Sequence, residues 1–258
     1  MHSRGRFEAF CRRWLFRIFS VFFHVRPKAM LVETDAKILV LRVDERVGNL
    51  IFLTPILNSL KLRYPRSQLD VLLHPKGEAL LRHHPAISAL QFFDKRALWR
   101  RHGPIFVPFF LRRNHYDLAI DACNPTEPSL TQVYLTRFCG ASQTLGFDHA
   151  LSRNLYHKTV QAIGDSVHEI DRRLALLSVL PGNAKTRQMS IGSIEMPDKD
   201  KPVRQWLEAN SKARYALINV GGRLEEKRLA AESYASMARM VRASGLVPHL
   251  VYGPRERD

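Results

Sequence analysis

From residue 37 onward, short unbroken runs of apolar residues alternate with longer segments in which apolar residues recur every three or four positions. An unbroken apolar run of about four to six residues is typical of a strand buried on both faces of a parallel sheet. Alternation of such runs with helical segments predicts βαβ units and a doubly wound α/β fold. Strands are predicted at 38–41, 69–73, 89–93, 116–121, 144–147, 215–220 and 247–252.

A stretch rich in Pro, Gly, Ser, Lys and Asp separates the fifth predicted strand from the sixth. It predicts a first Rossmann-like domain over residues 37–180, an interdomain linker over 181–212 and the start of a second domain over 213–258. Two strands and one helix cannot bury both faces of a parallel sheet, so we expect the second domain to be incomplete. Helices are predicted at 50–64, 77–83, 129–138 and 225–244, with a basic helical region at 95–113.

Residues 1–36 form a separate N-terminal segment that is both basic and aromatic. Up to Val25 its apolar residues recur at helical spacing, and Arg13 and Arg17 lie on the opposite stripe. This pattern predicts a helix that docks on an anionic membrane surface, followed by a linker at 28–36. Two alternatives are a helix packed on the protein's own core and a targeting signal. Arg17 and the lack of a small-residue cleavage site argue against a signal.

The formal net charge of +16 suits either a nucleic acid or an anionic membrane as a partner. No zinc-finger spacing, helix-turn-helix pattern or aromatic RNA platform accompanies the charge, so we expect no nucleic-acid partner. Three cysteines are too few for a disulfide framework, and Cys123 is expected to be a packing residue. His74, His83 and His84 lack acidic residues at ligand spacing, so no metal is expected.

The loop after the first predicted strand carries Arg42, Asp44, Glu45, Arg46 and Gly48. In a parallel sheet, ligands bind beyond the carboxyl ends of the strands, which makes this loop a candidate binding site. Its glycine would let the backbone approach a ligand at a helix N-terminus. The alternative is a solvated turn whose charges pair among themselves. The loop matches neither the dinucleotide fingerprint nor the P-loop.

A second glycine-containing turn, Gly221–Arg223, lies between a predicted strand and a predicted helix, and Lys227 follows it. Backbone N–H groups and the helix dipole at such a turn favour a phosphate, and the two cations would add to this preference. The alternative is an ordinary turn with basic residues at the surface.

Several of these stretches, taken in chain order, resemble glycosyltransferase family 9, which contains the ADP-heptose:lipopolysaccharide heptosyltransferases. The resemblance covers about 220 residues, from Lys37 to the end of the chain. No single stretch is diagnostic, but the ordered set is specific. The stretches are 37–42, 48–57, 60–65, 116–121, 140–147, 168–171 with 174–180, and 221–229 with Glu232 and Tyr234.

The resemblance implies a GT-B architecture of two Rossmann-like domains, with a lipid-linked acceptor on the first and a nucleotide sugar on the second. It implies inverting, metal-independent transfer from an ADP-sugar such as ADP-heptose to the lipopolysaccharide core or lipid A. No cofactor is implied. The location would be the cytoplasmic face of the inner membrane. By resemblance the donor phosphates are held by Gly221, Gly222, Arg223 and Lys227. The acceptor-side residues are Arg42, Arg46, Gly48, Thr54 and His168.

Two departures from the family pattern bear on activity. Many members have Asp as the proposed base at the position of Asn49, and an amide cannot accept a proton. Asp44 or Glu45 would then be the base, or the acceptor differs, or the site is inactive. The family's Asp-Ser/Thr-Gly…His segment is absent, so we expect a truncated transferase that is inactive alone. The alternative function is a non-catalytic membrane-surface remnant. For His168, the alternative to acceptor contact is helix capping.

Overall fold

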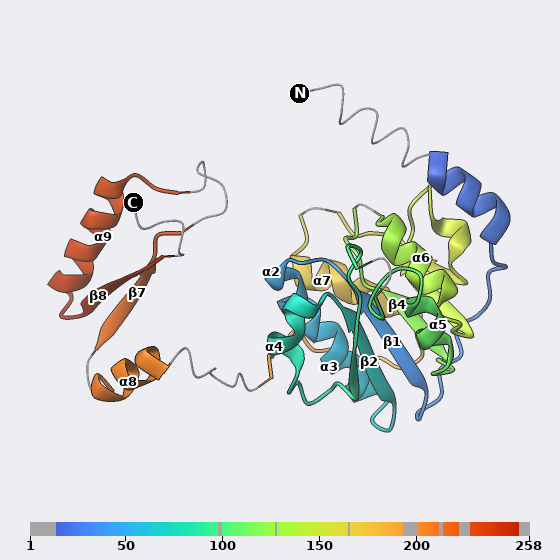
Figure 1. Ribbon diagram of the computed structural model, residues 1–258, viewed down its shortest axis with the longest axis horizontal. Helices are drawn as coiled ribbons and strands as arrows, with labels where there is room; N and C mark the ends of the chain where they lie inside the picture. Colours follow the sequence, from blue (N-terminus) through green and yellow to red (C-terminus); the bar gives the residue numbers. More distant parts are fainter. Residues whose placement is uncertain are drawn as a thin grey trace. The chain divides into compact units, whose positions relative to one another are not determined.

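The computed structural model describes residues 14–97, 100–126, 128–164, 166–192, 201–211, 214–221 and 228–252. The chain divides into two compact units, Met1–Glu195 and Met196–Asp258 (Figure 1). Each unit has its own parallel sheet, and the two are described separately below.

The first unit contains a parallel sheet of six strands in the order β3-β2-β1-β4-β5-β6. In the register, Val40 of β1 lies between Val71 of β2 and Ile120 of β4. The strand order reverses between β1 and β4, so the carboxyl ends of these two strands form the topological switch point. The strands are β1 Lys37–Arg42, β2 Gln68–Leu73, β3 Ala89–Phe92, β4 Leu118–Asp121, β5 Gln143–Phe147 and β6 Lys158–Val160.

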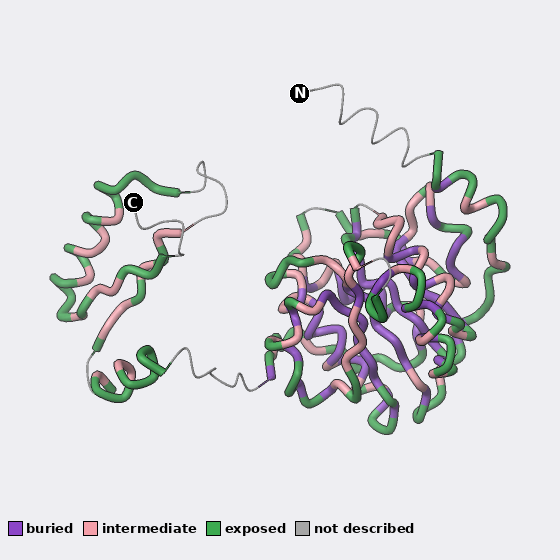
Figure 2. Tube along the Cα trace, viewed as in Figure 1, coloured by how far each residue is buried: buried purple, intermediate pink, exposed green. Residues whose placement is uncertain are grey.

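Five of these strands were predicted, and β6 was not, because its three residues form no apolar run. The buried residues are concentrated along the central strands, as Figure 2 shows. Alternate residues of β1 face opposite layers: Ile38 and Val40 pack in one cluster, and Leu39 and Leu41 in the other. The sheet is therefore covered on both faces, as its unbroken apolar strands require.

Helices from different parts of the chain cover the two faces of the sheet (Figure 1). On the face of Ile38 lie α3 Thr54–Arg63, α7 Glu169–Leu174 and the short helix η3 Ala175–Val179. On the face of Leu39 lie α5 Val107–Arg112 and α6 Leu130–Phe138. Shorter elements complete the unit: α2 Val47–Ile51, η1 Pro75–Gly77, α4 Glu78–Leu81 and η2 Arg153–Leu155.

The helix predicted over 50–64 is two helices, α2 and α3, with a break at residues 52–53. Pro55 explains the break, because proline has no N–H for Ile51 and its ring would clash with that carbonyl. The hydroxyl of Thr54 donates a hydrogen bond to Ile51 O instead, at 2.8 Å. The predicted basic helical region at 95–113 is also shorter than expected, since its described helical part is α5 alone.

Residues 14–36 of the N-terminal segment pack on the rest of the first unit, and residues 1–13 lie outside the described residues. For one face of the helix, this is the alternative in which it packs on the protein's own core. Residues 14–23 are helical, and Phe16 is fully buried against α6 and η2. The predicted linker at 28–36 instead follows the sheet edge, where Lys28 N donates to His157 O at 3.1 Å and Leu31 N donates to Gln143 Oε1 at 2.9 Å. Among the described residues, no helix is both long and apolar enough to cross a bilayer.

The second unit has two parallel strands, β7 Tyr215–Asn219 and β8 Val247–Val251, and the helix α9 Ala231–Ala243. A further helix, α8 Lys201–Ala209, lies inside the predicted linker, and its Trp206 ring contacts the rings of Tyr215 and His249. This part of the linker prediction was wrong, because a composition rich in Pro, Lys and Asp was taken to exclude a helix, whereas residues 201–209 form an amphipathic one. No described residue of this unit is buried (Figure 2).

The other end of the predicted linker follows the first unit. Asn58 Nδ2 of α3 donates to Gln188 O at 3.0 Å, and Gly192 N donates to Leu80 O at 3.2 Å. The hydroxyl of Ser59 accepts a hydrogen bond from Thr186 N at 2.9 Å. Residues 184–192 are therefore attached to α3 and α4 rather than free in solvent.

Candidate functional site

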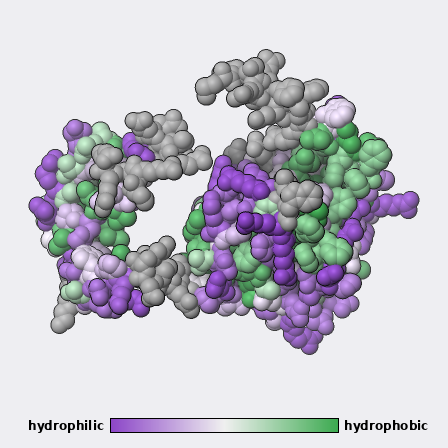
Figure 3. All heavy atoms as spheres, in the orientation of Figure 1, coloured by the Kyte–Doolittle hydropathy of each residue, from purple (hydrophilic) through white to green (hydrophobic). Residues whose placement is uncertain are grey.

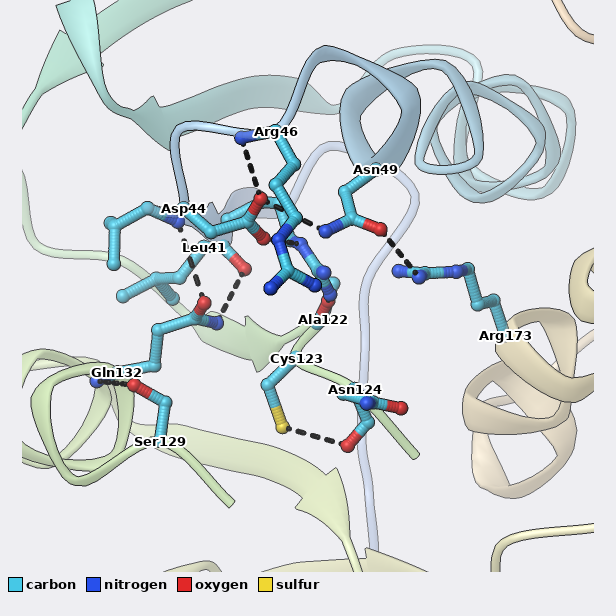
Figure 4. Close-up of polar contacts among 12 residues, drawn as sticks. Leu41, Asp44, Arg46, Asn49, Ala122, Cys123, Asn124, Ser129, Gln132 and Arg173 are labelled. Carbon is cyan, nitrogen blue, oxygen red and sulfur yellow. Dashed lines mark hydrogen bonds and ion pairs between the residues drawn. The ribbon is translucent and has the colours of Figure 1, made fainter. Parts of the chain in front are cut away.

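The carboxyl ends of β1 and β4 are joined by a side chain from the facing helix α6. Gln132 Nε2 donates to Leu41 O at 3.1 Å, and its Oε1 accepts from Val43 N at 3.4 Å (Figure 4). The same Nε2 also donates to Asp121 Oδ1 at 2.6 Å. Since Gln132 is buried, these bonds hold the start of the loop after β1 at a fixed distance from β4.

Asp121, the last residue of β4, is fully buried and hydrogen-bonded on both carboxylate oxygens. The hydroxyl of Tyr156 donates to Oδ2 at 2.6 Å, and Cys123 N donates to Oδ1 at 3.0 Å. Burial raises the pKa of Asp121, while the hydrogen bonds from Tyr156 and Cys123 oppose that rise. This carboxyl group therefore fixes Gln132 and the backbone after β4, and it is not accessible to solvent.

Cys123 is a packing residue, as the sequence predicted. It is 4% exposed, and burial raises the pKa of its thiol well above the ordinary value, with the charge of Asp121 acting in the same direction. The thiolate is therefore disfavoured, and the thiol is a poor nucleophile.

The loop after β1 is organised around Asp44 (Figure 4). Arg42 is buried, its Nη1 donates to Ala122 O at 2.5 Å, and its Nε lies 2.5 Å from Asp44 Oδ2. Asp44 Oδ1 accepts from Arg46 N at 3.0 Å, which closes an Asx turn before α2. The structure thus brings together Arg42, Asp44 and Arg46, three of the residues predicted for this site. The ion pair between Arg42 and Asp44 also matches the alternative prediction, a turn whose charges pair among themselves.

Asn49 lies between Asp44 and Arg173, as Figure 4 shows. Its Nδ2 donates to Asp44 Oδ1 at 2.9 Å, and its Oδ1 accepts from Arg173 Nη2 at 3.3 Å. Arg173 of α7 is 3% exposed and pairs with Glu169, four residues earlier, at 2.7 Å. The amide is therefore fixed in orientation, with its nitrogen toward the carboxylate and its oxygen toward the guanidinium.

Sequence analysis did not single out Arg173, although it falls between two stretches that carry the family resemblance. The spacing of Glu169 and Arg173 on a helix was the available signal, since residues four apart share a face. Burial lowers the pKa of Arg173, and the nearby charge of Arg42 acts in the same direction. Its Nη1 is buried and has no hydrogen-bond partner among the described residues.

Glu45 belongs to a different group of charges from its neighbour Asp44. Its carboxylate lies 2.6 Å from Lys76 Nζ, 3.8 Å from Arg96 and 3.9 Å from His74. The hydrogen bond from Lys76 is the main cause of a lowered pKa for Glu45. The two candidate bases are thus separated, and Asp44 is the one in contact with Asn49.

Three further predicted residues have different surroundings. Thr54 is fully buried, and its hydroxyl oxygen also accepts from Ser190 N at 3.1 Å. His168 caps α7, where its Nδ1 accepts from Ile170 N at 3.2 Å, so helix capping is what the structure contains. At Gly48, an added Cβ would meet no atom within 4 Å, so the backbone there is open to a ligand.

Of the residues predicted to bind donor phosphate, only Gly221 is among the described residues, and Gly222, Arg223 and Lys227 lie outside them. Gly221 N donates to Asn219 Oδ1 at 3.0 Å at the end of β7. Among the described residues, no group of three or more His, Cys, Asp or Glu side chains is arranged to hold a metal ion.

The described site can therefore orient a hydroxyl group and accept its proton. Asp44 has a side chain that is 31% exposed, and the amide of Asn49 is 2.9 Å away. A hydroxyl placed beside this pair would meet a carboxylate acceptor and a rigid polar group, next to the cationic Arg173.

No family model matches the sequence, and no curated protein matches it. Solved structures do match. A glycosyl transferase family 9 structure from Veillonella parvula DSM 2008 superposes with a TM-score of 0.70 at 22% identity, covering 89% of this chain and 66% of that one. The E. coli heptosyltransferase WaaC with ADP gives 0.62 at 18% identity, covering 84% and 67%. E. coli ADP-heptose lps heptosyltransferase II gives 0.61 at 17%, covering 85% and 65%.

These likenesses establish the fold. The chain has the α/β architecture of GT-B-type glycosyltransferases, as predicted, with a doubly wound parallel sheet in the first unit. It spans about two thirds of the length of the structures that it matches.

Proposed function

We propose that this chain is part of a family 9 glycosyltransferase that transfers a sugar, heptose or a close relative, from an ADP-sugar to a hydroxyl of the lipopolysaccharide core or lipid A. Transfer would invert the anomeric centre, need no metal and take place at the cytoplasmic face of the inner membrane. The shared fold and the ordered sequence resemblance support this proposal together. At 17–22% identity the fold itself does not specify the sugar or the acceptor.

The contact between Asp44 and Asn49 is the observation that carries the proposal. Asn49 stands at the family's base position, and its amide donates to the carboxylate of Asp44 at 2.9 Å. We infer that Asp44 is the base and that Asn49 orients the acceptor hydroxyl. The hydroxyl oxygen would attack C1 of the sugar, its proton would pass to Asp44, and the nucleoside diphosphate would leave.

The protein carries positively charged residues on both the acceptor side and the donor side, which fits this assignment. On the acceptor side, Arg173 lies next to Asn49, and its buried Nη1 has no hydrogen-bond partner in the described part of the chain. On the donor side, the proposal assigns the leaving diphosphate to Gly221, Gly222, Arg223 and Lys227, with Lys227 neutralising charge on the departing group. We do not favour the non-catalytic alternative, because the loop keeps an accessible carboxylate beside the family's base position.

The test is acceptor-dependent release of ADP from ADP-heptose, with a lipid A–core acceptor and this chain joined to the C-terminal segment of a family 9 transferase. We expect Asp44→Asn to lower kcat by about 10²- to 10⁴-fold, which is the usual contribution of a general base. Glu45→Gln is the matched control, because it removes the adjacent carboxylate, and it should retain activity within about threefold. ADP affinity should be the same in both variants.

Loss of activity in Glu45→Gln with full activity in Asp44→Asn would assign the base to Glu45 and contradict our choice. If the wild-type chain neither turns over donor nor binds ADP, the proposal of a donor site in this chain fails.

A further inference from the structure

The helix at residues 14–23 presents an exposed apolar stripe on the side away from the first unit. Trp14, Val21 and Phe22 are 58%, 71% and 74% exposed, respectively. Phe16 fixes the opposite side of the helix, because it is fully buried beside Val133. The stripe is therefore held in an outward orientation by the core of the unit.

A second exposed apolar surface lies on α5, on the same face of the sheet. Phe109 is 56% exposed, and Phe106 at the start of the helix is 37% exposed. Helix α6 lies between the two surfaces: Phe23 packs edge-on against the Phe138 ring, and Arg112 Nε of α5 donates to Phe138 O at 3.0 Å. Figure 3 shows hydrophobic residues gathered over these three helices.

The segments that form this surface carry only cationic charges. Segments 14–32, 95–116 and 129–147 carry three, six and one Lys or Arg residues, and none of them contains Asp or Glu. The guanidinium of Arg113 lies 4.6 Å from the centre of the Phe109 ring, and that of Arg101 lies 5.0 Å from the Phe110 ring. Aromatic rings and arginines are thus adjacent on the same surface.

We propose that these helices form a lipid-contact patch, made up of Trp14, Val21, Phe22, Phe109, Arg101 and Arg113, that binds the surface of an anionic bilayer. Its rings would enter the boundary between headgroups and acyl chains while its arginines contact lipid phosphates. The described part of this helix, residues 14–23, is about 15 Å long, and its exposed apolar stripe suits a helix that lies on a bilayer. This inference rests on the membrane location given in the proposed function and deepens it, because it names the surface that would contact the lipid.

The absence of carboxylates in the three segments is what selects lipid over a protein partner. A protein partner would have to present an acidic surface opposite these cations to be complementary in charge. An anionic bilayer needs only cations and apolar groups, which is the composition of the patch. The rival polyanion is a nucleic acid, which would use the arginines but gain little from the exposed Val21 and Phe22.

The test is co-sedimentation of the full chain with sucrose-loaded vesicles of phosphatidylcholine, with or without 30% phosphatidylglycerol. We expect binding to the anionic vesicles only, weakened by added salt. Phe22→Ser and Phe109→Ser should each lower the partition coefficient about tenfold, and Arg113→Ala about fivefold. Leu62→Ser is the matched control, because Leu62 is 57% exposed but lies on α3, on the other face of the sheet. It should bind as the wild type does.

The substituted side chains are exposed, and equal circular dichroism spectra and thermal midpoints would verify that the variants are folded. Equal binding of neutral and anionic vesicles would overturn the proposal, as would wild-type binding by both serine variants. A gel shift with a random RNA provides the third arm. If the wild-type chain binds RNA and not vesicles, the patch is a nucleic-acid surface and the lipid proposal is wrong.

Discussion

At the residue scale, neighbouring carboxylates in this protein have different roles because each faces a different set of partners. Asp44 is turned toward Asn49, whereas Glu45 is paired with Lys76. Asp121 ends β4 and is enclosed by Tyr156 and Gln132. We propose the first as the base, the second is held as a surface ion, and the third is enclosed in the core.

The buried carboxyl of Asp121 predicts a pH dependence of stability. Burial raises its pKa above the ordinary value of 3.8, so the folded state binds a proton more tightly than the unfolded state. Its contribution to the free energy of unfolding is therefore most favourable at low pH and falls as pH rises from about 4 through the folded-state pKa. Because Asp121→Asn does not titrate, the stability of the wild type relative to this variant should decrease over that window.

Urea unfolding at several pH values between about 4 and 7 would measure this difference. Asp35→Asn, at an exposed turn, controls for the general effect of removing a negative charge. A difference between wild type and Asp121→Asn that does not change with pH would contradict the prediction.

At the scale of elements, we expect the same Phe→Ala substitution to cost much more stability on the buried side of helix 14–23 than on its exposed side. Phe16→Ala removes a fully buried ring beside Leu155 and should lower the free energy of unfolding by about 3–5 kcal/mol. Phe22→Ala removes a ring that is 74% exposed and should change it by less than about 0.5 kcal/mol. Chemical denaturation measures both. Equal effects would mean that the helix is not attached through Phe16.

The elements also show where sequence reasoning succeeds. Strands such as β1 and β4 were predicted because burial on both faces requires unbroken apolar runs, which are visible without any tertiary information. The break before α3 was signalled by Pro55 but was overlooked because the apolar spacing continues across it. The position of α8 depends on Trp206 packing against strands that follow it in the sequence.

The candidate site was only partly predictable for a similar reason. Arg42, Asp44 and Asn49 are close in sequence and belong to one loop, so their proximity followed from the topology of the sheet. Arg173 lies 124 residues beyond Asn49, and only the packing of α7 brings it there. Likewise, the aromatic face predicted for the N-terminal helix included Phe19 and Phe22, but Phe19 packs against Phe138 of α6. Phe16, which lay outside that predicted face, is the ring that is fully buried.

At the scale of the whole molecule, the two units differ in how many of their apolar residues are buried. The first has hydrophobic clusters on both faces of its sheet, whereas no described residue of the second is buried. In the second unit, Leu217, Leu250 and Met240 remain 64%, 52% and 69% exposed. A two-stranded sheet with one covering helix gives little buried area to offset the entropy of ordering the chain.

Separate expression of the two units would test this contrast. Residues 1–195 should unfold cooperatively on heating, with a sigmoidal loss of far-ultraviolet circular dichroism. Residues 196–258 should lose ellipticity gradually, without a transition. A sigmoidal transition of the shorter piece would show that its stability comes from contacts outside the described residues.

The attachment of the N-terminal segment has a consequence for synthesis of the chain on the ribosome. Val25 N donates to Asn154 O at 2.8 Å, so the partner of this segment is made about 130 residues later. At roughly 5–20 residues per second, the aromatic helix waits about 6–26 s for the surface that covers its inner side. During that interval both of its apolar sides are open, and Phe16 is as available to a chaperone or a bilayer as Phe22. The order of synthesis therefore leaves the aromatic N-terminal helix uncovered until α6 and η2 have been made.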